Sequence, residues 1–336
     1  MSAFVPAAPP VLNPRSAARV VTLTLNPALD TVTGIDHVVA DHKMRCGPTQ
    51  IHPGGGGINV ARVLHRLGIE VCSVHLAGGL TGQRLNGLLA EEGVPMQAIE
   101  TVAETRTALA VRETSSGRDF RFTLPMAGVQ QDEWRAAVAA TQALAQDAAY
   151  LVLSGSVPDG VPMTVYADVA QWARVQGVRV VLDTSGPALL PALEAGVYAF
   201  KPSWRELCSL VGRSLDNCDH WRDAARDLIA RGMAEWVAVS LGEQGADVVT
   251  ADAAWRAQAL AVDAQTTVGA GDSFVAGLVW AWAQDAPMPD AVRAAVAASA
   301  AALLSPGTAL CQPADVMRLL PQVVLSDGAG PVAQVR

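Results

Sequence analysis

The residue of this 336-residue chain with the clearest chemical potential is Asp272, which follows Gly269, Ala270 and Gly271 and precedes an apolar segment. Glycines leave the backbone open to a ligand, and the first N–H groups of a helix have no partner within it, so the loop suits a phosphate. A carboxylate there is repelled unless it has a function. The function that fits is taking a proton from a hydroxyl that attacks phosphorus. A helix cap in a tight turn is an equal alternative for this motif alone.

A second glycine-rich segment spans residues 53–62 (PGGGGINVAR) and has four consecutive glycines before Asn59. Such a run costs chain entropy, which favours a place where the backbone itself contacts a ligand. The apolar periodicity of residues 58–67 predicts a helix whose N-terminus faces that ligand, with Asn59 near a sugar hydroxyl. A flexible loop is the weaker alternative, because the run adjoins a helix start and does not lie in a Ser/Gly linker.

Asp30 is a further candidate for binding sugar hydroxyls. It comes just after residues 19–25, a short β-branched segment that predicts a buried strand ended by proline. Ligands of open α/β sheets collect beyond the carboxyl ends of the strands. A turn aspartate explains the position of Asp30 equally well.

A small β-sheet lid is predicted from about residues 31–50 and 106–124, which interrupt the α/β pattern. Residues 107–113 and 118–124 read as a hairpin. Arg106 and Arg121 lie at its edges, where arginines can close over a phosphorylated substrate with bidentate contacts. Taken singly, each is more often a solvated surface arginine.

The elements that must position these groups alternate regularly from residue 148 onward. Strands are predicted at 148–153, 178–182, 197–200 and 235–240, and helices at 163–175, from 203, at 272–284 and at about 288–304. Repeated βα units indicate a mostly parallel sheet covered by helices on both faces. We therefore expect one α/β domain over residues 19–322, a disordered extension at 1–18 and a tail at 323–336.

Composition and charge exclude several classes of function. A chain that is 51% hydrophobic and 17% charged is typical of a globular protein with an extensive core. A net charge of −8 without any basic run argues against a nucleic-acid partner. The five cysteines lack zinc-site or disulfide-framework spacing, which favours a reducing cytoplasm. No apolar run reaches the ~20 residues of a membrane span, and the N-terminus lacks the order of a signal peptide.

Four motifs together closely resemble the PfkB family of ribokinase-like sugar kinases over about residues 20–322. They are PGGGGINVAR at 53–62, KPxxxEL at 201–207, SLGxxG at 240–245 and TVGAGDS at 267–273. The resemblance implies a three-layer α/β/α sandwich with a small β-sheet lid. It also implies ATP as a substrate, Mg²⁺ and K⁺ as cofactors, and a homodimer formed through the lid.

The resemblance further implies roles for single residues. Asp272 would be the catalytic base, and Gly269, Ala270 and Gly271 the anion hole. The sugar phosphate would be held by Asp30, Lys43, Gly55, Gly56, Asn59, Arg106, Arg121 and Ser156. The ATP pocket would be lined by Lys201, Ser203, Ser240, Gly242 and Gly245. Mg²⁺ would lie near Glu206, bound through water, and K⁺ would be held by the backbone of Thr266, Val268, Ser305 and Gly307.

One position departs from the family pattern. Ser203 stands where the KPNxxE motif has asparagine, and its shorter side chain cannot orient a metal-bound water in the same way. The departure puts the affinity for Mg²⁺ or the positioning of the phosphates in question.

The implied reaction is ATP-dependent phosphorylation of the free 1-hydroxyl of a sugar phosphate. The segments KMRC at 43–46, FRFTLP at 120–125 and LSGSVPDGV at 153–161 are most similar to the bacterial 6-phosphofructokinase branch, which implies fructose 6-phosphate. The 1-phosphofructokinases and tagatose-6-phosphate kinases share the same frame but usually carry a lysine in the glycine run. A sugar-phosphate sensor that kept the pocket without the chemistry is the non-enzyme alternative, and turnover of ATP distinguishes the two.

Overall fold

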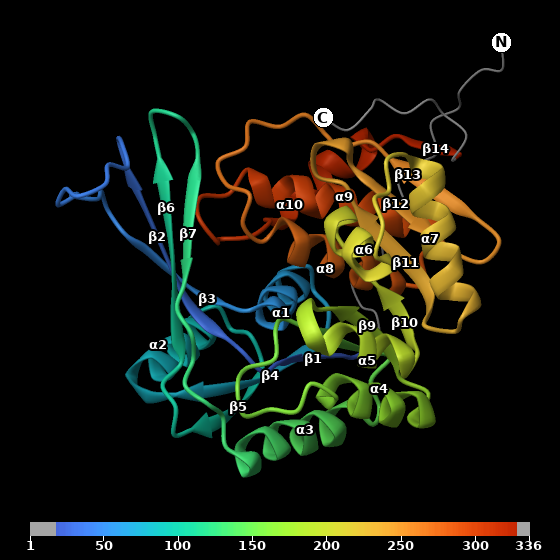
Figure 1. Cartoon of the computed structure of the whole chain (residues 1–336), viewed down its shortest axis with the longest axis horizontal. Helices are drawn as coiled ribbons and strands as arrows, with labels where there is room; N and C mark the ends of the chain where they lie inside the picture. Colours follow the sequence, from blue (N-terminus) through green and yellow to red (C-terminus); the bar gives the residue numbers. More distant parts are fainter. Residues whose placement is uncertain (1–17, 328–336) are drawn as a thin grey trace.

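The computed structural model describes residues 18–327 of the chain as a large sheet between two layers of helices, with a second sheet at one side (Figure 1). The predicted fold class is confirmed. The predicted N-terminal extension lies almost wholly outside the described residues, as do residues 328–336 of the predicted tail.

The large sheet has ten strands in the order β14-β13-β12-β11-β10-β9-β8-β1-β4-β5. The strands from β5 to β11 run parallel, and β12, β13 and β14 are antiparallel. Their bounds are β1 Val20–Thr24, β4 Val71–Gly78, β5 Met96–Thr101, β8 Tyr150–Ser154, β9 Arg179–Asp183, β10 Val197–Phe200, β11 Ala234–Ser240, β12 Ala246–Val249, β13 Ala254–Ala257 and β14 Leu325–Asp327. The central strands β1 and β8 are buried along their whole length because helices cover both faces.

One layer of helices is built from α1 Gly56–Arg66, α2 Gly79–Glu91, α8 Ala270–Trp282, α9 Met288–Leu303 and α10 Pro313–Leu319. The other contains α3 Gln131–Ala145, α4 Val165–Gln176, α5 Leu189–Glu194, α6 Trp204–Val211 and α7 Cys218–Ala230. Helices α8 and α9 pack closely, because a Cβ on Gly277 would lie 2.6 Å from the carbonyl oxygen of Ala294. The small residues of these two helices thus bring their backbones together in the core.

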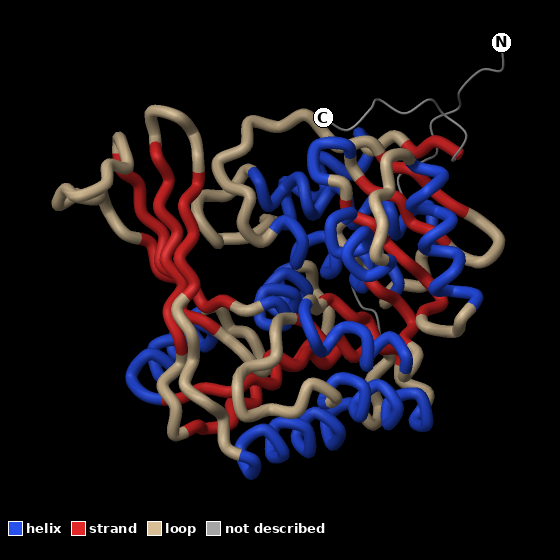
Figure 2. Tube along the Cα trace, viewed as in Figure 1, coloured by secondary structure: helices blue, strands red, loops and turns tan. Residues whose placement is uncertain are grey.

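The second sheet is the predicted lid, a four-stranded sheet in the order β3-β2-β6-β7. Its strands are β2 Ala28–Ile35, β3 Gln50–Gly54, β6 Arg106–Glu113 and β7 Asp119–Thr123. It extends from the body as a separate arm (Figure 2). The lid begins earlier than predicted, so Asp30 belongs to a lid strand, and residues 36–49 form a loop without strand at its outer end (Figure 1).

The structure corrects the predicted start of the tail. We expected the domain to end at residue 322, but Leu325–Asp327 adds β14 to the sheet by pairing with β13. The hydrophobic pattern of three residues is too short to predict such an edge strand. No helix of the described residues is long and apolar enough to cross a membrane.

Candidate active site

Asp272 lies on the first turn of α8, directly after the loop that suits an anion. Gly269 precedes the helix with φ 76°, and the first hydrogen bond within the helix runs from the N–H of Ser273 to the carbonyl of Gly269 at 2.9 Å. The N–H groups of residues 270–272 therefore have no partner within the helix. The Asp272 carboxylate accepts a hydrogen bond from Nδ2 of Asn59 at 2.8 Å, so the starts of α1 and α8 meet here.

The surroundings of Asp272 place its titration close to neutral pH. Burial, together with the nearby carboxylate of Asp183, raises the pKa of Asp272 from its ordinary value to about 7, against the hydrogen bond from Asn59 and the charge of Lys201. A pKa near the working pH is what a general base requires. The environment of Asp272 thus fits removal of a proton from a hydroxyl.

Lys201 follows β10 and lies between Asp272 and β9. Its Nζ is 3.2 Å from Oδ1 of Asp183. Burial alone would lower the pKa of Lys201, but Asp183, Glu206 and Asp272 raise it above its ordinary value, so the ammonium stays charged. A Cβ on Gly271 would lie 3.6 Å from this Nζ. Lys201, assigned from sequence to the ATP pocket, therefore lies beside the anion loop.

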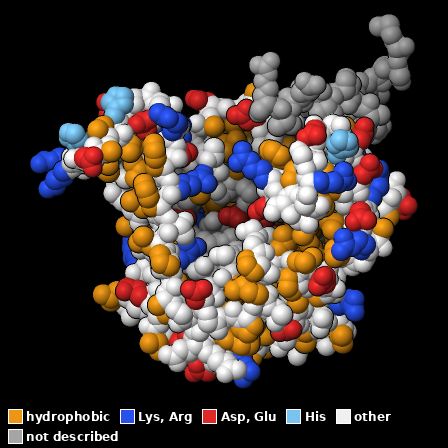
Figure 3. Space-filling view, in the orientation of Figure 1, with side chains coloured by type: hydrophobic (Ala, Val, Ile, Leu, Met, Phe, Trp, Pro, Cys, Tyr) orange, Lys and Arg blue, Asp and Glu red, His pale blue; other side chains and the backbone are white. Residues whose placement is uncertain are grey.

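A cavity of about 310 Å³ opens in front of Asp272. It is lined by Gly55, Gly56, Asn59, Ser154, Gly155, Ser156, Asp183, Thr184, Ser185, Glu206 and Asp272. In the space-filling view the surface is hollowed between the lid and the body, with basic side chains on the rim and acidic ones in the floor (Figure 3). The volume and the polar lining suit a small hydroxylated ligand.

The glycine run positions Asp30 as well as opening the backbone. A Cβ on Gly54 would lie 2.4 Å from the Asp30 carboxylate, and one on Gly56 would lie 2.1 Å from Oγ of Ser154. The run therefore lets β2, β3 and β8 approach the start of α1. The sequence analysis explained the glycines only by contact with a ligand and did not predict this packing role. Burial raises the pKa of Asp30 to about 6, although Arg62, Arg106 and Arg121 all lower it.

Asn26 connects Arg106 and Ser156, two of the residues predicted to hold the sugar phosphate. Its Oδ1 accepts from Nε of Arg106 at 2.8 Å, and its Nδ2 donates to Oγ of Ser156 at 2.9 Å. Arg106 and Ser156 are thereby held on one side of the cavity. The sequence reasoning missed Asn26, whose only signal is its place between the first strand and Pro27.

Of the other two basic lid residues predicted to bind the sugar phosphate, Arg121 reaches the body beside the site and Lys43 does not. Nη2 of Arg121 on β7 donates to Oγ1 of Thr267, in the loop before α8, at 2.5 Å. Lys43 is exposed in the loop of residues 36–49 at the outer end of the lid. Within this one chain, Lys43 is therefore not brought together with the other predicted sugar-binding residues.

A second cavity, of about 180 Å³, lies on the other side of the anion loop. The predicted ATP residues Ser240, Gly242 and Gly245 line it, together with Ala270 and Gly271. The remaining lining is mostly apolar and comes from Ala259, Leu260, Phe274, Val296, Ser299, Ala300 and Leu303. An apolar slot that ends at an anion loop fits a nucleotide base with its phosphates toward Asp272. Sequence reasoning missed the apolar wall, whose signal was the small-residue face of α9.

Ser203 and Glu206 form a capping box at the start of α6. Oγ of Ser203 accepts from the N–H of Glu206 at 3.2 Å, and the Glu206 carboxylate accepts from the N–H of Ser203 at 2.7 Å. Ser203 thus stabilises the helix that carries Glu206. Glu206 and Asp183 line the same cavity. No group of three or more metal-ligating side chains occurs within residues 18–327, so a divalent ion here would need oxygen atoms from water or phosphate.

The segments predicted to bind a monovalent cation are neighbours in space. The N–H of Gln265 donates to the carbonyl of Leu303 at 2.7 Å, which places Thr266 and Val268 beside Ser305 and Gly307. Thr266 and Ser305 are buried. The two segments are therefore close enough to hold one ion between them, and the binding itself remains a prediction.

A larger cavity, of about 710 Å³, holds none of these groups. It lies at the opposite ends of β9, β10 and β11 and is lined in part by the exposed residues Arg174 and Arg179. Ligands of parallel sheets collect at the carboxyl ends of the strands, where Ser154, Asp183 and Ser240 lie. The smaller cavities beside Asp272 are therefore the candidate active site.

Comparisons with known proteins agree with this geometry. Residues 23–315 match the model of the pfkB family of carbohydrate kinases. The ATP-dependent 6-phosphofructokinase isozyme 2 of Mycobacterium tuberculosis is 42% identical over 300 residues, covering 89% of this chain and 88% of that protein. The 1-phosphofructokinase of Rhodobacter capsulatus is 35% identical over 286 residues, covering 85% of this chain and 90% of that protein.

A solved structure gives the same result for the fold. The crystal structure of phosphofructokinase-2 from Escherichia coli in complex with substrates and products superposes with a TM-score of 0.87 at 39% identity, covering 91% of this chain and 99% of that chain. That protein has also been solved in complex with potassium and in a tetrameric inhibited form. Since the family model and these relatives span nearly the whole chain, this protein belongs to the pfkB family of carbohydrate kinases.

Proposed function

We propose that this protein is an ATP-dependent 6-phosphofructokinase that converts fructose 6-phosphate to fructose 1,6-bisphosphate. The observation that carries the proposal is the placing of Asp272 between a polar cavity and an apolar one, at the start of α8. The relative from Mycobacterium tuberculosis, 42% identical, supports the choice of reaction.

The chemistry follows from this placing. The sugar lies in the polar cavity with its 1-hydroxyl toward Asp272, and the nucleotide lies in the apolar cavity with its terminal phosphate on the loop of residues 269–271. Asp272 takes the hydroxyl proton while the oxygen forms its bond to phosphorus and the bond from phosphorus to the leaving ADP oxygen breaks. The N–H groups of the loop and the charge of Lys201 stabilise the negative charge of the transferring group.

Arginines on the lid provide recognition of the substrate's own phosphate. Arg106 and Arg121 both lie close enough to lower the pKa of Asp30, so positive charge surrounds the place where the sugar binds. Charge-assisted hydrogen bonds to a phosphate contribute about 1.5–3 kcal/mol each. A clamp of this kind rejects a sugar without phosphate because its charges are then left unpaired.

We infer that the kinase uses Mg²⁺ and K⁺. Carboxylate oxygens are the ligands that Mg²⁺ prefers, and Glu206 and Asp183, which line the polar cavity, would hold the ion through water where the nucleotide phosphates approach Asp272. When bound, Mg²⁺ neutralises charge on those phosphates. The buried backbone at residues 266 and 305 fits K⁺, and phosphofructokinase-2 from Escherichia coli has been solved with potassium.

We also propose that the protein forms a homodimer through the lid. Strand register puts Ile51, Leu109 and Phe122 in one row across the sheet, on the face opposite to Asp30 and Arg106. Ile51 and Phe122 are exposed in the single chain. Hydrophobic side chains gather along the lid (Figure 3), and a second copy of the lid would cover them.

A substrate panel tests the proposal. Purified protein with ATP, Mg²⁺ and K⁺ is offered fructose 6-phosphate, fructose 1-phosphate, tagatose 6-phosphate and unphosphorylated fructose, and ADP formation is followed. Fructose 6-phosphate should give the highest kcat/KM and free fructose the lowest. A preference for fructose 1-phosphate or tagatose 6-phosphate would assign the alternative kinase activities. If no ADP forms with any of the four sugars, the proposed function is rejected, and the sugar-phosphate sensor becomes the favoured alternative.

A further inference from the structure

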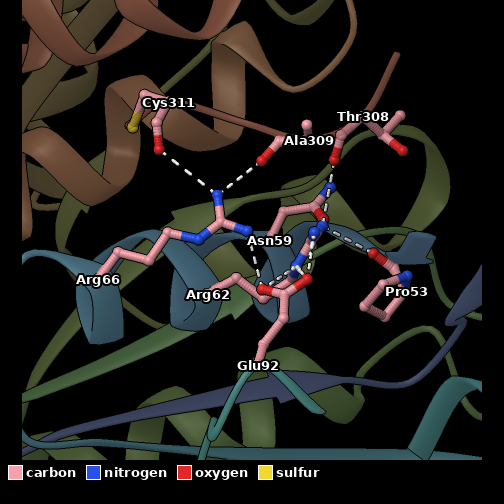
Figure 4. Close-up of polar contacts among 8 residues, drawn as sticks. All are labelled: Pro53, Asn59, Arg62, Arg66, Glu92, Thr308, Ala309 and Cys311. Carbon is pink, nitrogen blue, oxygen red and sulfur yellow. Dashed lines mark hydrogen bonds and ion pairs between the residues drawn. The ribbon is translucent and has the colours of Figure 1, made fainter. Parts of the chain in front are cut away.

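Two arginines of α1 share one carboxylate just behind the proposed active site (Figure 4). Nη2 of Arg62 lies 2.6 Å from Oε1 of Glu92, and Nη2 of Arg66 lies 2.8 Å from Oε2 of the same group. The side chain of Arg62 is fully buried, and that of Arg66 is 20% exposed. Since a buried charge is costly without partners, the contacts of Arg62 indicate what it holds in place.

Nε of Arg62 also donates to Glu92, at 3.0 Å from Oε1. The third nitrogen, Nη1, shares its two N–H groups among three acceptors. It donates to the carbonyl of Pro53 at 2.9 Å, to Oδ1 of Asn59 at 3.3 Å and to the carbonyl of Thr308 at 3.2 Å. One guanidinium thereby joins the glycine run, the first turn of α1 and the chain after α9 (Figure 4). A planar group with five donors can span these acceptors, whereas a lysine ammonium cannot.

The contact with Asn59 determines how its amide points. The two ends of an amide are alike in shape but opposite in hydrogen bonding. With Oδ1 held by Arg62, Nδ2 faces Asp272 and donates to its carboxylate. In the reverse orientation, Oδ1 would face the carboxylate and repel it.

The contact with Thr308 acts on the other side of the base. Thr308 precedes Leu310, which has φ 64° and reaches toward the anion loop. A Cβ on Gly269 would lie 2.3 Å from Cδ2 of Leu310, so the two segments are packed together. Arg62 therefore touches both structures that flank Asp272, the amide of Asn59 and the segment that supports the loop.

We propose that Arg62 is a positioning residue for phosphoryl transfer, which orients the amide of Asn59 toward Asp272 and holds the chain at Thr308 against the anion loop. The inference rests on the proposed function, because it gives a role to the base of that reaction. Arg62 itself lines neither of the two cavities beside Asp272. Its loss should lower the rate of the chemical step and leave the binding of ATP nearly unchanged.

Arg66 offers a matched control within the same cluster. It shares Glu92 with Arg62 and donates through Nη1 to the carbonyl of Ala309 at 2.6 Å. Its hydrogen-bond partners among the described residues are Glu92, Ala309 and Cys311, and Asn59 lies about two turns earlier on the helix, on the other side of Arg62 (Figure 4). A conservative change at either arginine disturbs the ion-pair cluster, but only a change at Arg62 releases the amide.

The test compares Arg62→Lys with Arg66→Lys in steady-state kinetics and thermal unfolding. Arg62→Lys should lower kcat at least 10-fold, with KM for ATP within about 2-fold of wild type, since a group acting in the transition state affects kcat. Arg66→Lys should keep kcat within about 2-fold of wild type. Equal losses of kcat in both variants, or a wild-type kcat in Arg62→Lys, would overturn the proposal.

A pH profile provides a readout that a purely structural role would not move. Asp272 is faced by Asp183 from β9, Lys201 after β10, Asp30 from β2 and Asn59 from α1, and the Asn59 hydrogen bond lowers its pKa. Releasing the amide should therefore shift the acidic limb of kcat in Arg62→Lys to higher pH. An unshifted limb together with the kcat loss would contradict the route through Asn59.

Asn59→Ala is the second variant, needed if Arg62→Lys does not fold. It leaves Arg62 bonded to Glu92, Pro53 and Thr308 and should itself lower kcat. Where Arg62→Lys does fold, adding it to Asn59→Ala should lower kcat less than it does in the wild type, because only the contact with Thr308 is then lost. An Asn59→Ala protein with wild-type kcat would refute the inference. Wild-type turnover is measured first with each sugar of the panel, so a wrong substrate assignment is recognised before any variant is compared.

Discussion

At the scale of single residues, the fold disfavours the charged form of Asp272, the proposed base. Its pKa is raised to about 7 in the folded protein, chiefly by burial, whereas an unfolded chain titrates near the ordinary value of 3.8. Between these two pH values the Asp272 carboxyl is protonated in the folded state and ionised in the unfolded state. The contribution of Asp272 to stability is therefore fully present at low pH and is lost as pH rises toward 7.

The first residue-scale prediction concerns Asp272→Asn. Removing the base should lower kcat by about 10²–10⁴, with ATP and sugar phosphate still bound at near-normal affinity. The same change should raise the melting temperature at pH 8, because a neutral amide does not carry the buried charge. Kinetics and thermal unfolding at pH 5 and pH 8 check both effects. Near-normal turnover would refute the assignment of Asp272 as the base.

At the scale of elements, the junction between β3 and α1 does two things at once. The glycines at 54–57 admit the Asp30 carboxylate and the side chain of Ser154, and Gly55, with φ 119°, starts the helix that carries Asn59. Few other residues tolerate this backbone angle, and none has so small a side chain. The run is therefore required by packing between elements as well as by the proposed ligand.

An alanine comparison tests this role of the glycine run. Gly54→Ala should displace Asp30, whose carboxylate lies 2.4 Å from the added Cβ, and lower kcat/KM for the sugar phosphate with KM for ATP unchanged. Gly87→Ala is the matched control, because its Cβ meets nothing within 4 Å in the interior of α2. That change should stabilise the protein by about 0.5–1 kcal/mol and leave catalysis unaltered. Equal kinetics in the two variants would contradict the assignment of Asp30.

At the scale of the whole molecule, the lid has two unlike faces. Asp30, Arg106 and Arg121 face the body and the cavity, and the opposite face carries the apolar row through Leu109 and Phe122. A sheet exposed on both sides is poorly stabilised by itself, so covering the apolar face would hold the lid in place. Dimer formation and sugar binding are expected to be coupled through this sheet.

Phe122→Asp tests the coupling. A charge at a residue that is 51% exposed in the single chain should not unfold it but should disfavour burial against a second copy. We expect a monomer in sedimentation analysis and a raised KM for the sugar phosphate. Val175→Asp on α4, at a residue that is 81% exposed and far from the lid, should leave both measurements unchanged. A Phe122→Asp dimer would exclude the lid as the interface.

Local signals in the sequence predicted the fold class, which the structure confirms, and selected Asp272 as the candidate base. Apolar periodicity predicted the parallel sheet and its helices, and the glycine motifs predicted the loop before Asp272, because both depend on neighbours within a few residues. The same reasoning missed β5 and α3, whose mixed burial gives weak periodicity, and overlooked α7, whose buried Trp221, Ala225 and Leu228 stand at helical spacing. It also ended the domain too early, before β14.

Only the tertiary structure decided which groups meet at the site. Asn59 reaches Asp272 across 213 residues of sequence, and Asn26 joins Arg106 and Ser156 across 80 and 130. A pattern in the sequence carries no information about such a pairing, since it arises only where strands of different units end, and their helices begin, at the same edge of the sheet. The roles of Arg62 and of the two lid faces became visible for that reason, because burial and register exist only after the chain has folded.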